Sequence, residues 1–316
     1  PETLIAVVKS KNALSTAGNN GLRFSHLQCI LNTSAGKEGS GPVFGSFWRR
    51  TMEQPDAFPP EFWELFLQSN LKALGEKSRP ICVGSTMRRT LAAGVVRQYK
   101  PKLEEFNLLE RQYGVASDGA ELMGLRAKAD HQLKHWLIAL DCTNAFNSVK
   151  RVAILEEVAI RTPGLTPFVA KCYGEKPANI IFRMNTGQRR RISSNAGIHQ
   201  GNGLGPTLFF IPVEPILRKS QEQFEAPWVE LLAYLDDLVL AMGELTKENS
   251  STIRFLVQEL ACIGVHINNT KTKTVPPMNH TPTEREIAAL AAMGIGVAKE
   301  GGQVIGTPIG TDAFIQ

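Results

Sequence analysis

The chain has 316 residues, of which 43% are hydrophobic and 21% charged, and its net charge is +5. This length and composition exclude a fibre, a disulfide-stabilised miniprotein and a mostly disordered chain, because they suffice for a sizeable folded core. The basic balance, with a pI near 9.0, is compatible with a polyanionic partner.

The cysteines and the apolar runs narrow the class of protein further. Five cysteines without a CxxC pair argue against a disulfide framework or a zinc site and predict reduced thiols in an intracellular protein. No apolar run reaches the roughly 18 residues that a membrane-spanning helix needs, and the start lacks the layout of a signal peptide. The first residue is Pro1, and we therefore expect a segment of a longer polypeptide.

The first third of the chain alternates helical spacing with polar breaks. The range 34–42 is rich in glycine and serine, which predicts a loop. A short basic stretch at 79–83 is predicted to be extended. Apolar spacing predicts helices over residues 2–12, 24–31, 47–52, 60–71 and 86–99.

Strand patterns begin near residue 135. The predicted elements are, in order, a strand at 135–141, a helix at 150–161, a hairpin of 180–186 and 189–193, a helix at 207–221, two apolar runs within 230–242, and a helix at 251–263. This order favours an antiparallel sheet with helices on one face, which is an α+β layer.

Two adjacent acids, Asp236 and Asp237, interrupt the apolar run at 231–242. Unpaired charge is costly to bury, so something must compensate these carboxylates. A tight turn at this point would let both approach one bound cation. The alternative is an exposed hairpin tip with ordinary solvated acids.

A third acid, Asp141, ends the apolar strand at 135–141. Its alternative role is that of a helix N-cap for the segment that follows. Taken with Asp236 and Asp237, it forms a set of hard oxygen ligands suited to Mg²⁺ and substrate phosphates. Such a set predicts in-line phosphoryl or nucleotidyl transfer.

A glycine-rich loop, 197–206, lies between these acids in the sequence and opens a helix. Its glycines permit a close backbone approach, and a helix N-terminus favours a phosphate or a base edge. A structural turn is the alternative for this loop.

Three segments resemble motifs A, B and C of reverse transcriptases, and most closely those of non-LTR retrotransposons: 137–149 (LIALDCTNAFNSV), 200–206 (QGNGLGP) and 233–237 (AYLDD). Further matches follow in the family order: 18–26 resembles the N-terminal extension motif, 79–85 the fingers motif, 264–272 motif D and 305–310 the primer-grip hairpin. The resemblance covers nearly the whole chain.

The resemblance implies an α+β fold made of the fingers and palm of a right-hand polymerase, with a ferredoxin-like antiparallel palm sheet packed on helices. Residues 1–134 would be mainly fingers with the N-terminal extension motif. Residues 135–316 would be mainly palm, with part of 160–200 returning to the fingers. We expect no thumb within this chain, because it ends just after the predicted grip hairpin.

By the same resemblance, Asp141, Asp236 and Asp237 would hold two Mg²⁺ ions, with Mn²⁺ as a substitute and the Cys142 carbonyl as a further ligand. Phe146 would exclude the ribose 2′-hydroxyl and so select dNTPs; a simple core aromatic is the alternative.

Other positions would bind the substrates. Lys72 and Arg79 would grip the triphosphate, although a solvated basic face is the alternative for both. Gln200 and Gly201 would line the nascent base pair. In motif B, Asn202 and Gly203 replace the family's commoner Asp-Pro, which puts the rigidity of that loop in question.

Two more positions carry a role by resemblance. Tyr234 would pack near the primer terminus, or belong to the core. Lys271 would donate a proton to pyrophosphate, or be an ordinary surface lysine.

The function implied is an RNA-directed DNA polymerase that transfers nucleotides from dNTPs to a primer 3′-hydroxyl on an RNA template. The alternatives are a catalytically weak nucleic-acid-binding scaffold and an RNA-dependent RNA polymerase, against which Phe146 argues. Expected partners are the RNA template, a DNA or RNA primer and the rest of a larger retroelement polyprotein, with no membrane. The expected location is the nucleus, with cytoplasmic passage.

Overall fold

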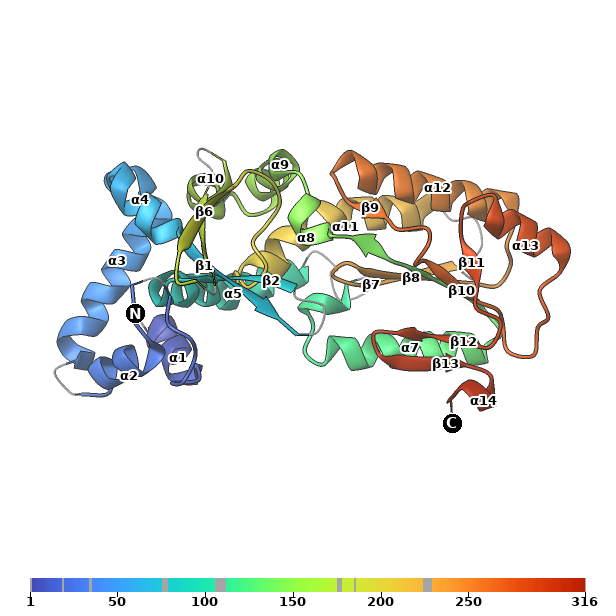
Figure 1. The fold of residues 1–316 in the computed structure, drawn as a ribbon, viewed down its shortest axis with the longest axis horizontal. Coiled ribbons are helices and arrows are strands. Elements are labelled where there is room, and N and C mark those ends of the chain that lie inside the picture. Colours follow the sequence, from blue (N-terminus) through green and yellow to red (C-terminus); the bar gives the residue numbers. More distant parts are fainter. Residues whose placement is uncertain are drawn as a thin grey trace. The chain divides into compact units, whose positions relative to one another are not determined.

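The computed structural model describes residues 2–18, 20–33, 36–75, 79–105, 112–174, 178–184, 186–223 and 229–315. The chain forms two compact units, each built from two separated stretches (Figure 1). Unit 1 comprises Pro1–Pro101 and Val149–Leu208, and unit 2 comprises Lys102–Ser148 and Phe209–Gln316. The assignment of 1–134 to fingers and 135–316 to palm stays a prediction.

Helices form most of unit 1. They are α1 (Glu2–Ser10), α2 (Phe24–Asn32), the π-helix η1 (Gly36–Ser40), α3 (Gly41–Glu53), η2 (Pro55–Ala57), α4 (Pro60–Leu67), α5 (Thr86–Glu105, which runs into unit 2), α9 (Arg151–Arg161), η4 (Pro163–Leu165) and α10 (Thr166–Tyr173). The loop predicted at 34–42 is wrong over 36–42, where η1 passes directly into α3. Proline at the second position of α3 accounts for its start, because proline lacks the N–H that a first helical turn leaves unbonded.

The sheet of unit 1 has the order β2-β1-β5-β6. Its strands are β1 (Ser69–Leu74), β2 (Arg79–Gly84), β5 (Ala178–Arg183) and β6 (Arg189–Ser194). The hairpin predicted around 180–193 is confirmed as the β5–β6 pair. Strands β1 and β5 pair in parallel, which joins segments that are distant in the sequence.

Unit 2 is built on a five-stranded sheet of order β11-β10-β3-β8-β7. Its strands are β3 (Trp136–Leu140), β7 (Val229–Tyr234), β8 (Asp237–Met242), β10 (Lys273–Val275) and β11 (Gly296–Val297). All neighbours are antiparallel except β10 and β11. This is a mainly antiparallel sheet packed on helices, which is an α+β arrangement as predicted.

Short strands and helices complete unit 2. They are η3 (Tyr113–Val115), α7 (Gly119–Gln132), β4 (Cys142–Thr143), α8 (Ala145–Ser148), α11 (Gly205–Gln223, which begins in unit 1), α12 (Lys247–Cys262), β9 (His266–Ile267), α13 (Glu284–Ala291), β12 (Gly301–Val304), β13 (Thr307–Gly310) and α14 (Asp312–Ile315). Helices α11 and α12 lie along one side of the sheet, and α7 with the β12–β13 hairpin lies along the other (Figure 1). The expectation of helices on one face only is therefore wrong, because α7 was not predicted.

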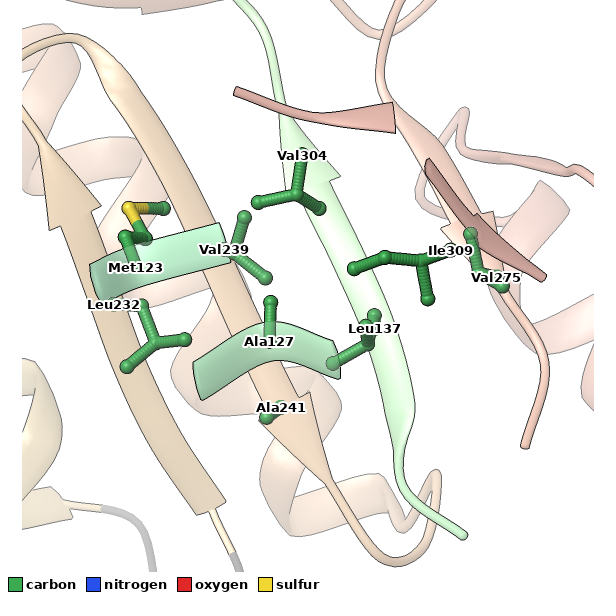
Figure 2. Packing of buried hydrophobic residues seen from close by; sticks show 9 residues of the cluster. All are labelled: Met123, Ala127, Leu137, Leu232, Val239, Ala241, Val275, Val304 and Ile309. Atoms are coloured by element: carbon green, nitrogen blue, oxygen red, sulfur yellow. The ribbon is translucent and has the colours of Figure 1, made fainter. Parts of the chain in front are cut away.

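The core between α7, the sheet and the β12–β13 hairpin fixes the position of the central strands. Figure 2 shows its nine buried side chains: Met123, Ala127, Leu137, Leu232, Val239, Ala241, Val275, Val304 and Ile309. Gly124 lets α7 approach β13, because an added Cβ would collide with the Thr307 Oγ1. In β8, every residue after Asp237 is buried, as expected for a strand covered on both faces.

Three further observations concern membrane-spanning segments, the cysteines and the N-terminal extension motif. In the described part of the chain, no helix is long and apolar enough to span a membrane. All five cysteines are free thiols. The match at 18–26 includes Asn19, which lies outside the described residues.

Candidate active site

The two adjacent acids lie at the turn of a β-hairpin. Strands β7 and β8 pair antiparallel up to Tyr234 opposite Asp237, which leaves Leu235 and Asp236 as a two-residue turn. Leu235 has φ +58°, a backbone conformation that branched L-residues rarely adopt. Both sequence interpretations expected a turn at the acids, and the structure has one, with Asp236 half-buried and Asp237 exposed. The neighbours of the turn bear on its chemistry.

Strand register brings Asp141 to the same end of the sheet. Strands β3 and β8 pair antiparallel, and their last pair is Leu140 opposite Leu238. The register continued by one residue places Asp141 beside Asp237, since residues that follow paired positions stay opposite one another. Asp141, which follows β3, and Asp236 and Asp237, at the turn into β8, therefore lie at the same end of these two neighbouring strands.

The backbone of Asp141 is held by the segment that resembles motif D. Its N–H donates to the Thr272 hydroxyl at 3.2 Å, and its carbonyl accepts from the Asn268 N–H at 2.7 Å. The next two residues, Cys142 and Thr143, pair with β9. These bonds fix the direction in which the strand leaves the sheet, so the alternative of Asp141 as a simple helix cap is not needed to explain its position.

The negative charges of all three carboxylates reach the Cys142 thiol. Burial, and then the negative charges of Asp236, Asp141 and Asp237, raise the pKa of the Cys142 thiol. One thiol feels all three charges only if they are close together, because Coulomb energy falls with distance.

The donor set fits a hard divalent cation. Three carboxylates supply oxygen ligands, which Mg²⁺ prefers. Within the described ranges, no group of three His, Cys, Asp or Glu side chains is arranged so that it could hold a metal ion by itself. In proteins Mg²⁺ usually binds through one or two carboxylates together with water and substrate phosphates.

Phe146 lies on α8, the short helix that follows β4. It is half-buried, and its ring stacks on Phe209 of α11 with centroids 4.7 Å apart and planes at 20°. The partner ring limits where Phe146 can move, and a fixed bulky ring is what a steric filter needs. The structure thus fits both the gate and the core-aromatic interpretation.

Tyr234 and Lys271 also lie in unit 2. Tyr234 is the last residue of β7, opposite Asp237, and packs on the core cluster of Figure 2. Lys271 is exposed, and its backbone N–H bonds to Asn268, the residue whose own N–H donates to Asp141. The motif D segment therefore contacts the backbone of Asp141 directly, while the Lys271 side chain faces solvent.

Lys72 and Arg79 share one face of the unit 1 sheet. Lys72 of β1 is opposite Ile81 of β2, and Arg79 is opposite Leu74. Because paired residues and alternate residues of a strand share a face, both cations point the same way. Both are exposed, so their charges are available to an anionic ligand.

The loop that resembles motif B is anchored to β2. The Gln200 carbonyl accepts from the Cys82 N–H at 2.7 Å. Gly201 has φ +91°, and a Cβ there would lie 2.8 Å from the Ile81 Cγ2. Only glycine fits this position.

The side chain of Asn202 holds the motif B loop in place. Its amide donates to the Tyr173 hydroxyl at 2.6 Å, and its side-chain oxygen accepts from the Leu204 N–H at 3.2 Å. The loop is thus fixed by side-chain bonds of Asn202, which stands where the family commonly has Asp, while Gly203 stands where it commonly has proline.

The comparisons with known proteins decide the family. The model of the family described as "Reverse transcriptase (RNA-dependent DNA polymerase)" matches residues 71–292. This chain belongs to the reverse transcriptase family. Members of the family generally depend on a divalent metal.

A curated relative of this reverse transcriptase chain comes from a retroelement. It is the retrotransposable element SLACS 132 kDa protein of Trypanosoma brucei gambiense, 29% identical over 202 residues. The match covers 63% of this chain and 16% of that protein, so the chain spans only a small part of the relative's length.

Solved telomerase structures share the fold. Telomerase from Candida albicans, in complex with a TWJ fragment of telomeric RNA, gives a TM-score of 0.54 at 12% identity, over 86% of this chain and 48% of that one. Apo telomerase from Candida tropicalis gives 0.52 at 15% identity, over 75% and 49%. These structures support the α+β polymerase fold of the reverse transcriptase chain.

Sequence reasoning missed the residues that hold the site of this reverse transcriptase. Gln112 bonds to Leu235 of the acidic turn, Thr272 bonds to Asp141, and Phe209 backs Phe146. All three are distant in sequence from the residue they contact. Two of them lay in segments that carried a signal: Thr272 ends the segment that resembles motif D, and the apolar run of α11 placed Phe209 in a helix. Neither signal identified the partner.

His199, beside the motif B loop, predicts a pH dependence of stability. Burial, and then the positive charges of Arg88 and Arg151, lower the pKa of His199 to about 3. Its Nε2 lies 2.7 Å from the Ser194 hydroxyl, and its ring meets the edge of Tyr173. The unfolded chain takes up this proton near pH 6.5 and the folded chain does not. Stability must therefore fall as pH drops below 6.5, by at most about 1.4 kcal/mol per pH unit.

Urea unfolding of the wild type and of His199→Gln at about pH 7.5 and pH 5.5 measures this effect. Glutamine retains a hydrogen-bonding group but does not titrate. We expect the wild type to lose more stability over this range than the variant does. An equal loss in both proteins would show that His199 does not contribute.

Proposed function

We propose that this chain is the catalytic part of an RNA-directed DNA polymerase. The reaction joins the primer 3′-hydroxyl oxygen to the α-phosphorus of a dNTP, breaks the bond from that phosphorus to the bridging oxygen and releases pyrophosphate. The observation that carries the proposal is the position of Asp141, Asp236 and Asp237 at the same end of the neighbouring strands β3 and β8. Membership of the reverse transcriptase family supports the choice of template and product.

By this proposal Asp141, Asp236 and Asp237, with the Cys142 carbonyl, hold two Mg²⁺ ions. When bound, such ions favour the ionised form of the primer hydroxyl and neutralise charge on the phosphates. The carboxylates keep their positions through strand pairing and through the bonds from Thr272 and Asn268 to the Asp141 backbone. Groups that are positioned before the reaction cost little reorganisation during it.

The remaining residues orient substrates in this proposal. The cations of Lys72 and Arg79 bind triphosphate oxygens, and Arg79 offers a two-pronged contact. Gln200 and Gly201 line the nascent base pair, and Tyr234 supports the primer end. Phe146 excludes the 2′-hydroxyl.

Proton transfer and assembly complete the proposal. Lys271, exposed beside the motif D turn, donates a proton to the leaving pyrophosphate. We propose an RNA template and a DNA or RNA primer as nucleic-acid partners. We further propose that the chain works as part of a larger retroelement protein, in the nucleus after passage through the cytoplasm.

Primer extension tests the proposed function. The purified chain is incubated with an RNA template, an annealed primer, dNTPs and Mg²⁺, with a DNA template and with rNTPs in parallel arms. We expect extension on RNA with dNTPs, its loss on addition of EDTA and its return with excess Mg²⁺ or Mn²⁺. Extension with rNTPs alone would support an RNA polymerase, and binding of primed template without extension in any arm would support a scaffold.

A further inference from the structure

A buried glutamine contacts the turn that carries the acidic pair. The Gln112 side chain is fully buried, at 0% exposure. Its Oε1 accepts from the Leu235 N–H at 2.5 Å and from the Gly114 N–H at 2.9 Å. Its Nε2 donates to the Leu235 carbonyl at 3.4 Å. One side chain thus satisfies both backbone groups of Leu235, which needs a donor and an acceptor on the same group.

Leu235, the residue that Gln112 contacts, has a backbone conformation that is unfavourable for its side chain. Leu235, at φ +58°, precedes Asp236 directly. A branched residue keeps this conformation only where its surroundings impose it. The two bonds from Gln112 fix the peptide groups on either side of the Leu235 Cα. They also define the direction in which the chain enters Asp236.

Gly114 has no side chain, and this lets Gln112 and Leu235 lie close to its backbone. A Cβ at this position would lie 2.6 Å from the Leu235 Cγ and 2.7 Å from the Gln112 Oε1. The neighbouring residue, Tyr113, packs on the core cluster of Figure 2. The segment 112–114 is therefore anchored in the core on one side and fits closely around the turn on the other.

We propose that Gln112 is a positioning residue for nucleotidyl transfer, which holds Leu235 at positive φ so that Asp236 and Asp237 are presented together to the metal ions. Gln112 touches neither substrate nor metal and acts only through the Leu235 backbone. This inference rests on the proposed function for its effect on rate. The contact that it invokes has a measurement of its own.

The chain offers a matched control at the far end of the same hairpin. Gln221 of α11 donates from Nε2 to the Val229 carbonyl at 2.7 Å and accepts at Oε1 from the Leu231 N–H at 2.8 Å. It thus makes a similar two-pronged contact to β7, at Val229 and Leu231, which lie six and four residues before the turn at Leu235 and away from the acids. Loss of Gln221 removes equivalent bonds without touching the turn.

The rate test compares Gln112→Met with Gln221→Met in single-nucleotide incorporation. Methionine keeps the length and loses the hydrogen bonds. For Gln112→Met we expect kcat to fall about 10- to 100-fold, as for second-layer partners of metal ligands, with little change in the KM for dNTP. For Gln221→Met we expect kcat to stay within about twofold, because the acids keep their support. Equal losses in both variants would overturn the inference, as would an unchanged kcat in folded Gln112→Met.

A rescue variant separates positioning from general loss of packing. Glycine adopts positive φ readily, so Leu235→Gly removes the strain that Gln112 opposes. In the Gln112→Met background we expect Leu235→Gly to recover part of the lost kcat. Failure of this rescue would contradict the role of Leu235. If Gln112→Met does not fold, Gln112→Asn, one methylene shorter, replaces it with the same expectations.

Amide hydrogen exchange distinguishes failure of this inference from failure of the proposed function. The Leu235 N–H is protected by Gln112 in the wild type, and we expect its exchange to quicken in Gln112→Met but not in Gln221→Met. If the chain shows this exchange pattern but has no polymerase activity, the contact of Gln112 with Leu235 stands and the proposed function is wrong. If the chain is active but exchange at Leu235 does not differ between the two variants, the inference about Gln112 is wrong.

Discussion

Asp141→Asn is expected to reduce the rate of single-nucleotide incorporation by at least about 10²–10³-fold, the size of effect seen when one preorganised electrostatic group is removed. Asparagine keeps the size and both backbone bonds, to Thr272 and Asn268, and loses the charge that would bind the proposed cation. The measurement is a pre-steady-state time course on a primed RNA template at saturating Mg²⁺.

Glu230→Gln is the matched control for this variant. Glu230 of β7 lies opposite Ala241, at the end of the β7–β8 hairpin away from Asp236 and Asp237, and pairs with Arg126 at 2.6 Å. Its neutralisation should leave the rate within about twofold, since pairs at this exposure contribute little. We also expect Asp141→Asn to melt no lower than the wild type, because it relieves repulsion among three nearby carboxylates. Similar rates for the two variants would remove Asp141 from the metal site.

Phe146→Ala is expected to lower the preference for dNTPs over rNTPs by about 10- to 200-fold, the range over which a pocket discriminates small steric differences. The reason is that the half-buried ring, held by stacking on Phe209 at 4.7 Å, no longer fills the space that a 2′-hydroxyl would need. The measurement is the ratio of kcat/KM for a dNTP and its matching rNTP.

Phe146→Tyr is the control for the aromatic position, because it keeps the ring and its stacking. We expect it to retain the wild-type preference for dNTPs. A strong preference for dNTPs that persists in Phe146→Ala would disprove the gate and leave Phe146 as a core aromatic. A wild type that prefers rNTPs would favour the RNA polymerase alternative.

Local sequence patterns predicted the parts of the fold that depend on near neighbours. The β5–β6 hairpin follows from two β-prone runs around Gly187, whose φ of +85° suits a turn. The turn at Leu235 and Asp236 follows from acids between apolar runs. Helix α7 was missed because its buried residues, such as Met123 and Ala127, are interspersed with glycine and charge, which weakens the apolar stripe.

Contacts between distant segments could not be predicted in the same way. The parallel pairing of β1 with β5 joins Ser69 to Ile180, and nothing local to either strand specifies the other. The three acids were predicted as candidates because charge is costly within apolar strands. Their common position required the register of β3 on β8, and the support from Gln112 required a contact across 123 residues.

The central claim is that the carboxylates serve chemistry rather than binding, and one paired measurement tests it most directly. Wild type and Asp236→Asn are compared for binding of a primed RNA template and for Mg²⁺-dependent extension of that primer with dNTPs. We predict equal binding by both proteins and extension by the wild type alone. Equal extension by both proteins would contradict the claim, because a polymerase cannot lose a metal-binding charge at its reaction centre without losing rate.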